Sequence, residues 1–239
     1  MPHQRSPEER HHDTVVTTFD SLLYLDACRH DTCSLVGSSG NLRNYLHGKL
    51  IDKSDVVIRV NNPPIRGYED YVGTRPADIL IFNDHIANCF GNSTHPTLYI
   101  RSTDNALTKN GGVIKKCQAH WVAPLYSFSR FIQQQTRAAL LYYAERFPST
   151  RLSIHATSGL KAVLFSMMIC RQVVLFGFGM QGAKTWHYYP PYSNYTPSHH
   201  DISIETRIIQ DLANGTFRSS LADFRDDTFG KLNITLLGY

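Results

Sequence analysis

The chain of 239 residues is 42% hydrophobic and 18% charged, which fits one large α/β domain with a sizeable core and excludes a disordered chain. The formal net charge of +4 includes no run of more than two Lys or Arg residues, so it argues against a nucleic-acid-binding surface and suits a small anionic ligand. No apolar run approaches the roughly 18 residues that a membrane-spanning helix needs.

The N-terminal segment, residues 1–20, opens with the polar stretch MPHQRSPEERHHD and has no signal-peptide core. We expect a disordered tail here, because solvation explains its histidines better than a metal site does. Residues 21–239 are expected to form a single domain, since they contain no internal repeat, low-complexity linker or boundary. No membrane anchor or signal is visible, which predicts a soluble protein as the sequence stands.

Short β-rich segments recur along the chain and predict the strands of a sheet. They are mostly continuous apolar runs that do not alternate, which is typical of strands buried on both faces of a parallel sheet. The segments are residues 34–37, 55–60, 78–82, 97–100, 120–123, 173–179 and 233–237.

Two long segments between these strands predict helices. Residues 131–147 carry apolar side chains at helical spacing and are followed by Pro148, which ends a helix. Residues 158–170 are nearly all apolar and predict a buried helix.

A third helix is predicted over residues 198–215. Ser198 is an N-cap candidate with Asp201 three residues later, and Gly215 ends the segment. The alternation of strands and helices predicts an α/β fold, a single Rossmann-like domain with a mostly parallel central sheet flanked by helices.

In such sheets ligands bind beyond the carboxyl ends of the strands. Three predicted strand ends carry small or polar residues: Gly37–Asn41, Asn61–Asn62 and Gly177–Gly179. In the first, Gly37 and Gly40 allow a tight turn and a close approach to a ligand, and free N–H groups at a helix start would favour a phosphate. The spacing matches neither dinucleotide fingerprint, so a plain turn and a phosphate cradle both stay open.

Polar residues at two further positions have a structural and a binding interpretation. Asn61 offers a donor and an acceptor to a sugar hydroxyl or a base edge, or it forms an Asx-turn before Pro63. Thr157, Ser158 and Gly159 begin the buried helix, where the hydroxyls either cap it or form a second helix start that favours an anion.

Two histidines are candidates for chemistry. His187 and Tyr188 lie in the loop WHYYPPY, which is typical of a substrate lid or of a small satellite core. His200 is expected in the first turn of the last helix, where the helix dipole would keep the imidazole neutral and able to accept a proton. A histidine at a helix start is also common as a plain surface residue.

Cysteines and asparagines give weaker indications. The five cysteines include no CxxC pair, so a zinc site is not expected, and their odd number leaves at least one free thiol. Four N-x-[ST] sequons favour a secretory compartment and a glycoprotein; they begin at Asn92, Asn194, Asn214 and Asn233.

Taken together, four stretches resemble the motifs of the animal-type sialyltransferases, glycosyltransferase family 29. The stretch CSLVGSSGNLRNYLHGKLIDKSDVVIRVNNPPIRGYEDYVGT is similar to the large motif, and ATSGLKAVLFSMMICRQVVLFGFG to the small motif. HYY resembles the third motif, and HDISIE, residues 200–205, fits the His-x4-Glu very small motif. The four stretches stand in the family's order, and the resemblance spans about residues 30–212.

The resemblance implies a GT-A-like variant of the fold and the transfer of sialic acid from CMP-sialic acid to a hydroxyl of a glycan ending in galactose or sialic acid. It further implies inversion, no metal, no cofactor beyond the donor substrate, and residence in the Golgi lumen. His200 would be the general base, and Cys33 and Cys170 would form a disulfide.

The donor site follows from the same resemblance. His187 and Tyr188 would reach the phosphate. The residues around the donor would be Ser38, Gly40, Asn41, Asn61, Thr157, Ser158, Gly159 and Tyr188.

Among the departures of the sequence from the family pattern, two bear on activity. Ser38 stands where the family usually has asparagine, and Pro190 replaces an acidic residue that usually follows the third motif. These departures keep an alternative open, a non-catalytic relative that binds a nucleotide or a glycan. An unrelated Rossmann-like oxidoreductase ranks far behind, because the glycine fingerprint is missing.

Overall fold

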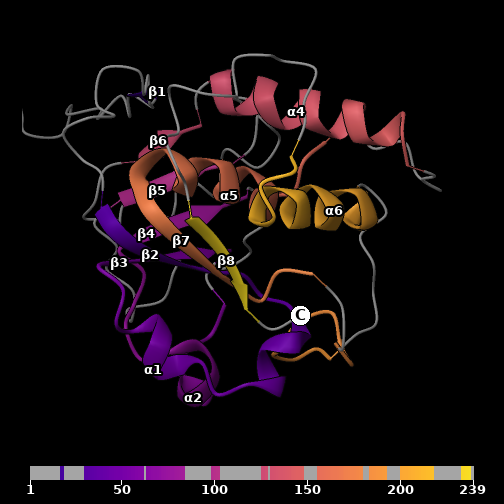
Figure 1. Ribbon diagram of the computed structural model, residues 1–239. Coiled ribbons are helices and arrows are strands. Elements are labelled where there is room, and N and C mark those ends of the chain that lie inside the picture. Colours follow the sequence, from indigo (N-terminus) through magenta and orange to yellow (C-terminus); the bar gives the residue numbers. More distant parts are fainter. Residues whose placement is uncertain are drawn as a thin grey trace, which may run out of the picture.

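The structure is a computed structural model. A parallel sheet forms the centre of the molecule (Figure 1). The structure describes residues 17–18, 30–61, 63–83, 98–102, 125–128, 130–147, 155–179, 183–192, 200–217 and 233–237. Within these residues the sheet has eight strands, and each neighbouring pair runs parallel. The strands are β1 (Thr17–Thr18), β2 (His30–Val36), β3 (Val56–Val60), β4 (Ile79–Phe82), β5 (Leu98–Arg101), β6 (Leu125–Ser127), β7 (Cys170–Phe176) and β8 (Asn233–Leu237).

The order of the strands is β1-β6-β5-β4-β3-β2-β7-β8. From β2 the chain builds the sheet outward through β3, β4, β5 and β6, and it then returns to place β7 on the other side of β2. The direction of winding therefore reverses between β2 and β7. Doubly wound sheets bind their ligands at such a switch point, beyond the carboxyl ends of the strands.

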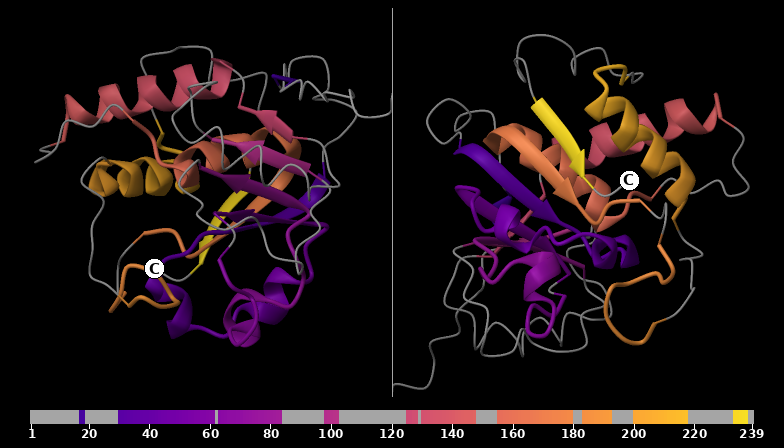
Figure 2. Two further views of the ribbon diagram at one scale, coloured as in Figure 1. Left: turned by 180° about the vertical axis from the view of Figure 1, so that it is seen from behind. Right: turned by 60° about the horizontal axis from the view of Figure 1, so that its bottom comes forward.

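Helices cover both faces of the sheet. On one face lie α4 (Arg130–Ala144), α5 (Ser158–Ile169) and α6 (Ile202–Ala213), and on the other lie the 3₁₀-helix η2 (Gly40–Asn44), α1 (Gly48–Ile51) and α2 (Glu69–Val72) (Figures 1 and 2). The helix α5 packs directly on β2, β3, β4 and β7, which explains why its sequence is apolar on nearly every side.

Two hydrophobic clusters fill the space between the layers. The larger one joins the strands to α4, α5 and α6, and it includes Cys33, Leu35, Phe165, Leu175 and Ile208. The smaller one lies under η2, α1 and α2 and contains Val36, Leu42, Ile51, Val57, Val72, Phe176 and Tyr188. Burial of each large aliphatic or aromatic side chain stabilises the fold by about 1.5–3 kcal/mol.

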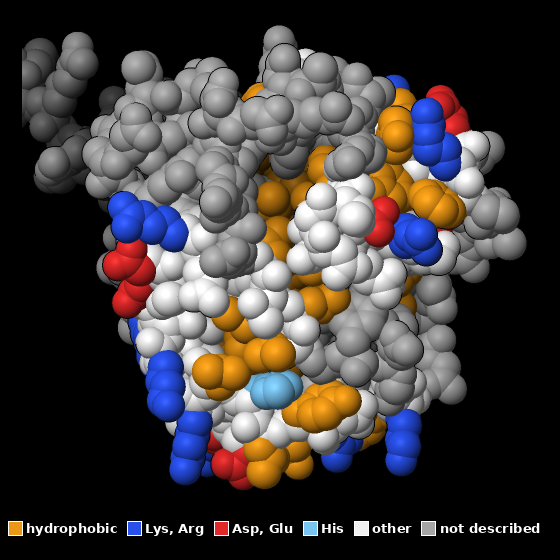
Figure 3. All heavy atoms as spheres, viewed as in Figure 1, with side chains coloured by type: hydrophobic (Ala, Val, Ile, Leu, Met, Phe, Trp, Pro, Cys, Tyr) orange, Lys and Arg blue, Asp and Glu red, His pale blue; other side chains and the backbone are white. Residues whose placement is uncertain are grey.

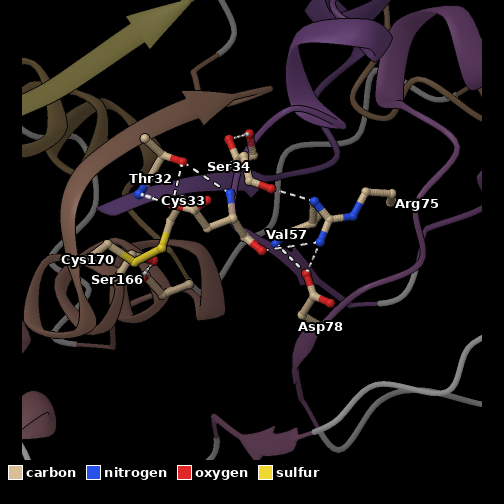
Figure 4. The surroundings of a disulfide bond; sticks show 11 residues. Thr32, Cys33, Ser34, Val57, Arg75, Asp78, Ser166 and Cys170 are labelled. Atoms are coloured by element: carbon tan, nitrogen blue, oxygen red, sulfur yellow. Dashed lines mark hydrogen bonds and ion pairs between the residues drawn. A yellow bond between two sulfur atoms is a disulfide. The ribbon is translucent and has the colours of Figure 1, made fainter. Parts of the chain in front are cut away.

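A disulfide joins the two central strands, as the family resemblance predicted (Figure 4). Cys33 of β2 and Cys170, the first residue of β7 and the C-cap of α5, have Cα atoms 6.0 Å apart. The two cysteines are 137 residues apart in the sequence, so in the chain-entropy model the bond contributes about 4–5 kcal/mol.

Hydrogen bonds tie the strands together at their amino ends (Figure 4). The Thr32 N–H donates to the Asp55 carboxylate over 2.8 Å. The Asp78 carboxylate accepts from the Val57 N–H at 2.7 Å and from the Arg75 guanidinium at 2.8 Å. This edge lies opposite the carboxyl ends of the strands, and its hydrogen bonds hold neighbouring strands together.

The sequence predicted most of these elements. Six of the strand segments correspond to β2, β3, β4, β5, β7 and β8, and two of the helix segments correspond to α4 and α5. The segment 120–123 lies outside the described residues, and β6 follows it. β1 lies inside the segment 1–20 that we expected to be disordered; the other residues of that segment lie outside the described residues.

The start of the third predicted helix was wrong. α6 begins at Ile202, because the Asp201 side chain caps it by accepting from the Ile204 N–H at 3.1 Å. The predicted cap, Ser198, lies outside the described residues. The predicted end is confirmed: Asn214 is the C-cap, and Gly215 follows with φ +69°.

Candidate active site

The predicted site residues gather around the carboxyl ends of β2, β3 and β7 and the starts of α5 and α6. The loop after β2, residues 37–41, is bonded to the loops 177–179 and 185–188. Segments far apart in the sequence therefore meet at the switch point of the sheet.

The glycines of the first loop serve this contact between loops. The N–H groups of Gly37, Ser39 and Gly40 donate to the carbonyls of Phe176, Gly177 and Trp186 over 2.8, 3.3 and 3.2 Å. A Cβ on Gly37 would lie 2.5 Å from the Gly177 oxygen, and one on Gly40 would lie 2.2 Å from the Thr185 oxygen. These hydrogen bonds support the plain turn rather than a cradle of free amides, since the amides already have partners.

Asn41 connects the same two loops from η2. Its side chain is buried, and Nδ2 donates to the carbonyls of Phe178 and Gly179 over 3.5 and 3.4 Å. The amide therefore holds the loop after β7 against the loop after β2.

The ring of Phe178 brings the first loop close to the start of α5. A Cβ added to Gly37 would lie 3.3 Å from one edge of this ring, and one added to Gly159 would lie 3.3 Å from another. The predicted donor residues Gly37–Asn41 and Thr157–Gly159 are thus neighbours through a single aromatic side chain. One signal for this role of Phe178 was visible in the sequence, a bulky residue between two glycines at a strand end.

Asn61 directly follows β3 in a left-handed conformation with φ +62°, and among the described residues no other non-glycine has positive φ. Asparagine tolerates this conformation better than most residues. The Asn61 Oδ1 accepts from the Asn83 N–H at 3.2 Å, so one end of the amide holds the strand end after β4. Its Nδ2 has no partner among the described residues and is the end available to a ligand.

His187 lies half-buried against the first loop. Its backbone forms a bridge with Ser39, and its ring nitrogen Nδ1 lies 3.4 Å from the Ser38 carbonyl. Because a carbonyl only accepts, Nδ1 carries the proton in this contact. Burial lowers the pKa of His187, and the bond to Ser38 opposes the shift, so the ring is neutral near pH 7 with the Nε2 lone pair free to accept.

The structure does not bring Tyr188 to the donor edge. Its side chain is fully buried in the smaller core cluster, and its hydroxyl donates to the Pro64 carbonyl over 2.6 Å. Burial raises the pKa of this phenol, and the buried Arg59 guanidinium nearby opposes the shift. This arrangement matches the satellite-core interpretation of the loop and not a contact with phosphate.

His200 lies just before the cap of α6, not in the first turn as predicted. Its Nδ1 is 2.9 Å from the backbone carbonyl of His155, which precedes the start of α5. The carbonyl fixes the proton on Nδ1 and leaves Nε2 as a proton acceptor in the neutral ring. The same contact places the histidine next to the segment that carries Thr157 and Ser158.

The start of α5 is closed by hydrogen bonds within the chain. Thr157 is the N-cap, and its hydroxyl accepts from the Leu160 N–H at 3.0 Å, which confirms the capping role. The Thr157 N–H and hydroxyl both donate to the Glu205 carboxylate of α6, over 2.8 and 2.5 Å. The hydroxyl of Ser158 lies 2.6 Å from that of Ser102, directly after β5.

Glu205 is the most perturbed carboxyl of this region. Burial raises its pKa from 4.5 to about 7, and the two Thr157 donors act in the opposite direction. Asp201 raises the pKa further, and Lys161 lowers it.

An exposed hydrophobic surface borders the first loop. Figure 3 shows hydrophobic side chains gathered on the lower part of the face, where η2 lies in Figure 1. The exposed large side chains include Tyr45, Leu46 and Leu50, which follow the first loop, and Tyr192, which follows the His187 loop. Arg43 lies over the Tyr192 ring, 5.4 Å from its centre.

Within the described residues, no three His, Cys, Asp or Glu side chains are grouped as metal ligands would be. In the same residues, no helix has the length and apolar character needed to cross a membrane.

A family model decides how this geometry is classified. The model of glycosyltransferase family 29 (sialyltransferase) matches residues 8–217. The chain belongs to this family.

Curated relatives of this family 29 protein carry different activities in their names. It is 30% identical over 178 residues to the human CMP-N-acetylneuraminate-beta-galactosamide-alpha-2,3-sialyltransferase 1, which covers 68% of this chain and 48% of that protein. It is 25% identical over 226 residues to the Arabidopsis thaliana beta-1,6-galactosyltransferase GALT29A, which covers 83% of this chain and 55% of the relative. The chain therefore spans about half the length of these two relatives.

A solved structure supports the same fold. The crystal structure of a mammalian sialyltransferase in complex with Gal-beta-1-3GalNAc-ortho-nitrophenol superimposes with a TM-score of 0.58 and 24% sequence identity. The match covers 78% of this chain and 66% of that chain. The predicted fold class is confirmed for this family 29 protein.

Sequence reasoning missed three residues that hold the candidate site of this family 29 protein together: Ser102, Lys161 and Phe178. It included Glu205 in the His-x4-Glu motif but did not predict its contact with Thr157. Lys161 and Glu205 carried one usable signal, since a charged residue on an otherwise apolar helix face is buried only when it has partners. Ser102 carried none, because a serine after a strand is common in any loop.

Proposed function

We propose that the protein is a sialyltransferase. It transfers sialic acid from CMP-sialic acid to a hydroxyl of a glycan that ends in galactose or sialic acid, with inversion and without a metal. The observation that carries this proposal is the His200 ring, whose Nδ1 is held by the His155 carbonyl so that Nε2 is the proton acceptor. Family membership supplies the reaction class.

The reaction follows as a single displacement. The Nε2 of His200 takes the proton of the acceptor hydroxyl while the hydroxyl oxygen bonds to the anomeric carbon of sialic acid. The bond from that carbon to the phosphate oxygen breaks, and CMP leaves with the electron pair. A base in this position accelerates such a step by about 10²–10⁴.

The donor is proposed to lie across the ends of β2, β3 and β7. The Asn61 Nδ2 faces no partner among the described residues and is available to a hydroxyl or base edge of the nucleotide. The residues proposed to line the donor are Ser38, Gly40, Asn41, Asn61, Thr157, Ser158 and Gly159. Tyr188 is left out of this set, because its hydroxyl is bonded to Pro64 in the core.

His187 is proposed to act on the phosphate. A phosphate leaving group needs electrostatic stabilisation more than protonation. The Nε2 of the neutral ring donates no hydrogen bond, but a bound phosphate next to it raises the imidazole pKa and favours the protonated donor form.

The acceptor glycan is proposed to lie along the exposed surface that begins at Tyr45 and Leu46. Exposed apolar patches on soluble proteins mark binding surfaces. The hydroxyl of Tyr192 on this surface lies 3.1 Å from that of Tyr68, so aromatic faces and polar atoms are available together.

A second candidate is a non-catalytic relative that binds a nucleotide or a glycan. Two observations favour it: the first-loop amides already have partners, and Tyr188 is buried. The substitution to Ser38 points the same way, because it removes an amide from the expected donor site.

The test is incubation with CMP-sialic acid and separately with UDP-galactose, each against a panel of galactosides and sialosides, followed by linkage analysis of the products. A sialylated product with inverted configuration supports the proposal. A galactosylated product assigns a different donor, and CMP binding without any product supports the non-catalytic candidate.

A further inference from the structure

Two buried charged residues connect the start of α5 to its neighbours on either side. The Glu205 side chain is 4% exposed and Lys161 is 7% exposed. Charged groups are rarely buried this deeply without a partner that makes their position matter.

Glu205 forms the connection to α6. One carboxylate oxygen accepts from the Thr157 N–H and the other from the Thr157 hydroxyl, so the carboxylate forms two hydrogen bonds with a single residue. Thr157 in turn caps α5 through the Leu160 N–H. The carboxylate therefore fixes both the position and the orientation of the residue that begins α5.

Lys161 forms the connection to β5. Its ammonium donates to the Ser102 carbonyl over 2.7 Å, and the Ser102 hydroxyl is within 2.6 Å of the Ser158 hydroxyl. The Ser102 N–H also donates to the Phe82 carbonyl at 2.7 Å, which ties this residue to the end of β4. Ser158 is therefore located relative to the sheet through Ser102 and Lys161.

The two connections act on the same short segment. His200 stands five residues before Glu205, and its ring is bonded to the His155 carbonyl two residues before Thr157. The Lys161 charge lies near enough to Glu205 to lower the pKa of that carboxyl, so the two side chains belong to one electrostatic group.

We propose that Glu205 and Lys161 are positioning residues that set Thr157 and Ser158 at a fixed distance from the His200 imidazole. This inference rests on the proposed function, in which Thr157 and Ser158 line the donor and His200 accepts the proton. Buried ion pairs are frequently replaced by apolar residues at no loss of stability. Stability alone therefore does not require Glu205 and Lys161 to be charged. A need to fix the geometry at the start of α5 gives a reason for these two charged side chains.

The test compares four variants with the wild type. Glu205→Met removes both acceptors at similar size, whereas Glu205→Gln keeps an acceptor for the Thr157 N–H and gains a donor for its hydroxyl. Lys161→Met removes the donor to Ser102. The matched control is Asp211→Asn, which alters another carboxylate of α6, one that accepts from the Tyr143 hydroxyl at 2.8 Å and anchors the far end of the helix.

Two readouts are needed. Amide hydrogen exchange at residues 157–161 reports the connections without any donor or turnover. The kcat and KM for CMP-sialic acid report positioning, because a displacement of about 1 Å at a site can lower the rate about 100-fold.

The proposal predicts faster exchange at residues 157–161 in Glu205→Met and Lys161→Met, unchanged exchange there in Asp211→Asn, and rescue by Glu205→Gln. It predicts that Glu205→Met lowers kcat by about 10- to 100-fold with a smaller change in KM. Unchanged exchange in Glu205→Met, or an equal loss of kcat in Asp211→Asn, overturns it. If the wild type transfers no sugar from any donor, the proposed function fails, and the exchange experiment still decides whether the two residues fix the start of α5.

Discussion

Two helix starts at the carboxyl edge of the sheet look alike in sequence but are built differently. Both η2 and α5 follow small and hydroxylated residues, and for both the sequence left open a structural interpretation and one in which free N–H groups bind a phosphate. At η2 the amides are bonded to carbonyls of the loops 176–177 and 186, so two loops are pressed together. At α5 the Thr157 N–H is bonded to a carboxylate from another helix.

The two helix starts differ in the kind of acceptor that their N–H groups meet, which is a neutral carbonyl at η2 and a carboxylate at α5. At η2, carbonyls accept from the amides without introducing a charge. At α5 the chain itself supplies the anion that a helix start favours, and burial raises the pKa of that anion to about 7. The proposed donor phosphate would therefore meet one helix start whose amides are bonded to backbone carbonyls and another whose charge depends on pH.

The largest effect on stability is expected at the far end of α5, where the disulfide anchors the helix. Replacing both cysteines, Cys33→Ala with Cys170→Ala, should cost about 2–5 kcal/mol, because the bond closes a loop between distant residues. Urea unfolding measures the loss. The control is reductant, which should lower the midpoint of the wild type and leave the double variant unchanged; equal midpoints without reductant would contradict the expected contribution.

A pH effect of about 3 kcal/mol is expected from Glu205. Its pKa rises from 4.5 to about 7 on folding, so the folded state binds the proton more tightly than the unfolded state. This contribution to the free energy of unfolding is complete below pH 4.5 and is lost as the pH rises through about 7.

Thermal unfolding of the wild type and Glu205→Gln from pH 5 to 8.5 checks this linkage. The wild type should lose stability relative to the variant as the pH rises. Parallel curves for the two proteins would show that Glu205 does not titrate on folding.

A substitution at the start of η2 tests whether close packing between the loops matters more there than at the start of α5. Gly40→Ala should destabilise the protein by about 1–3 kcal/mol, because the new methyl group would overlap the Thr185 carbonyl and separate the two loops. Gly159→Ala at the other start is the matched control, since its Cβ would lie 3.3 Å from side-chain atoms of Phe178 and Thr157 and would not overlap a backbone carbonyl. Unfolding midpoints should fall more in the first variant, and the opposite order would mean that the glycines of η2 are not required for loop contact.

The smallest effect is expected at His187. Burial lowers its pKa, so the ring is neutral near pH 7 and becomes a donor to phosphate only as the pH falls. CMP affinity should therefore increase by less than about tenfold from pH 7.5 to 5.5. A tenfold change in affinity corresponds to about 1.4 kcal/mol, the free energy of one pKa unit. Calorimetric titration of CMP into the wild type and His187→Asn separates the contribution of His187 to this pH dependence from that of other titrating groups. If CMP affinity has the same pH dependence in both proteins, His187 does not contact the phosphate.

Sequence reasoning was reliable where local pattern decides structure. The apolar runs located β2, β3, β4 and β7, and the lack of polar positions in 158–170 identified α5 as a buried helix. The pairing of Cys33 with Cys170 came from the family resemblance and is confirmed.

It was less reliable where a residue's partner comes from a distant segment. Nothing near Gly40 in the sequence reveals that Thr185 and Trp186 pack on it, and nothing near Thr157 reveals Glu205. The family resemblance assigned Tyr188 to the phosphate together with His187, but successive residues of an extended segment point to opposite sides, and the tyrosine points into the core.

The most direct test of the central claim is the rate of sialic acid transfer by His200→Ala beside His155→Ala, with CMP affinity measured for both. His155→Ala keeps the backbone carbonyl that holds the His200 ring, so it should retain transfer and CMP binding. His200→Ala should bind CMP and lose about 10²–10⁴ in kcat. Transfer at the wild-type rate by His200→Ala would contradict the assignment of the base and, with it, the proposed mechanism.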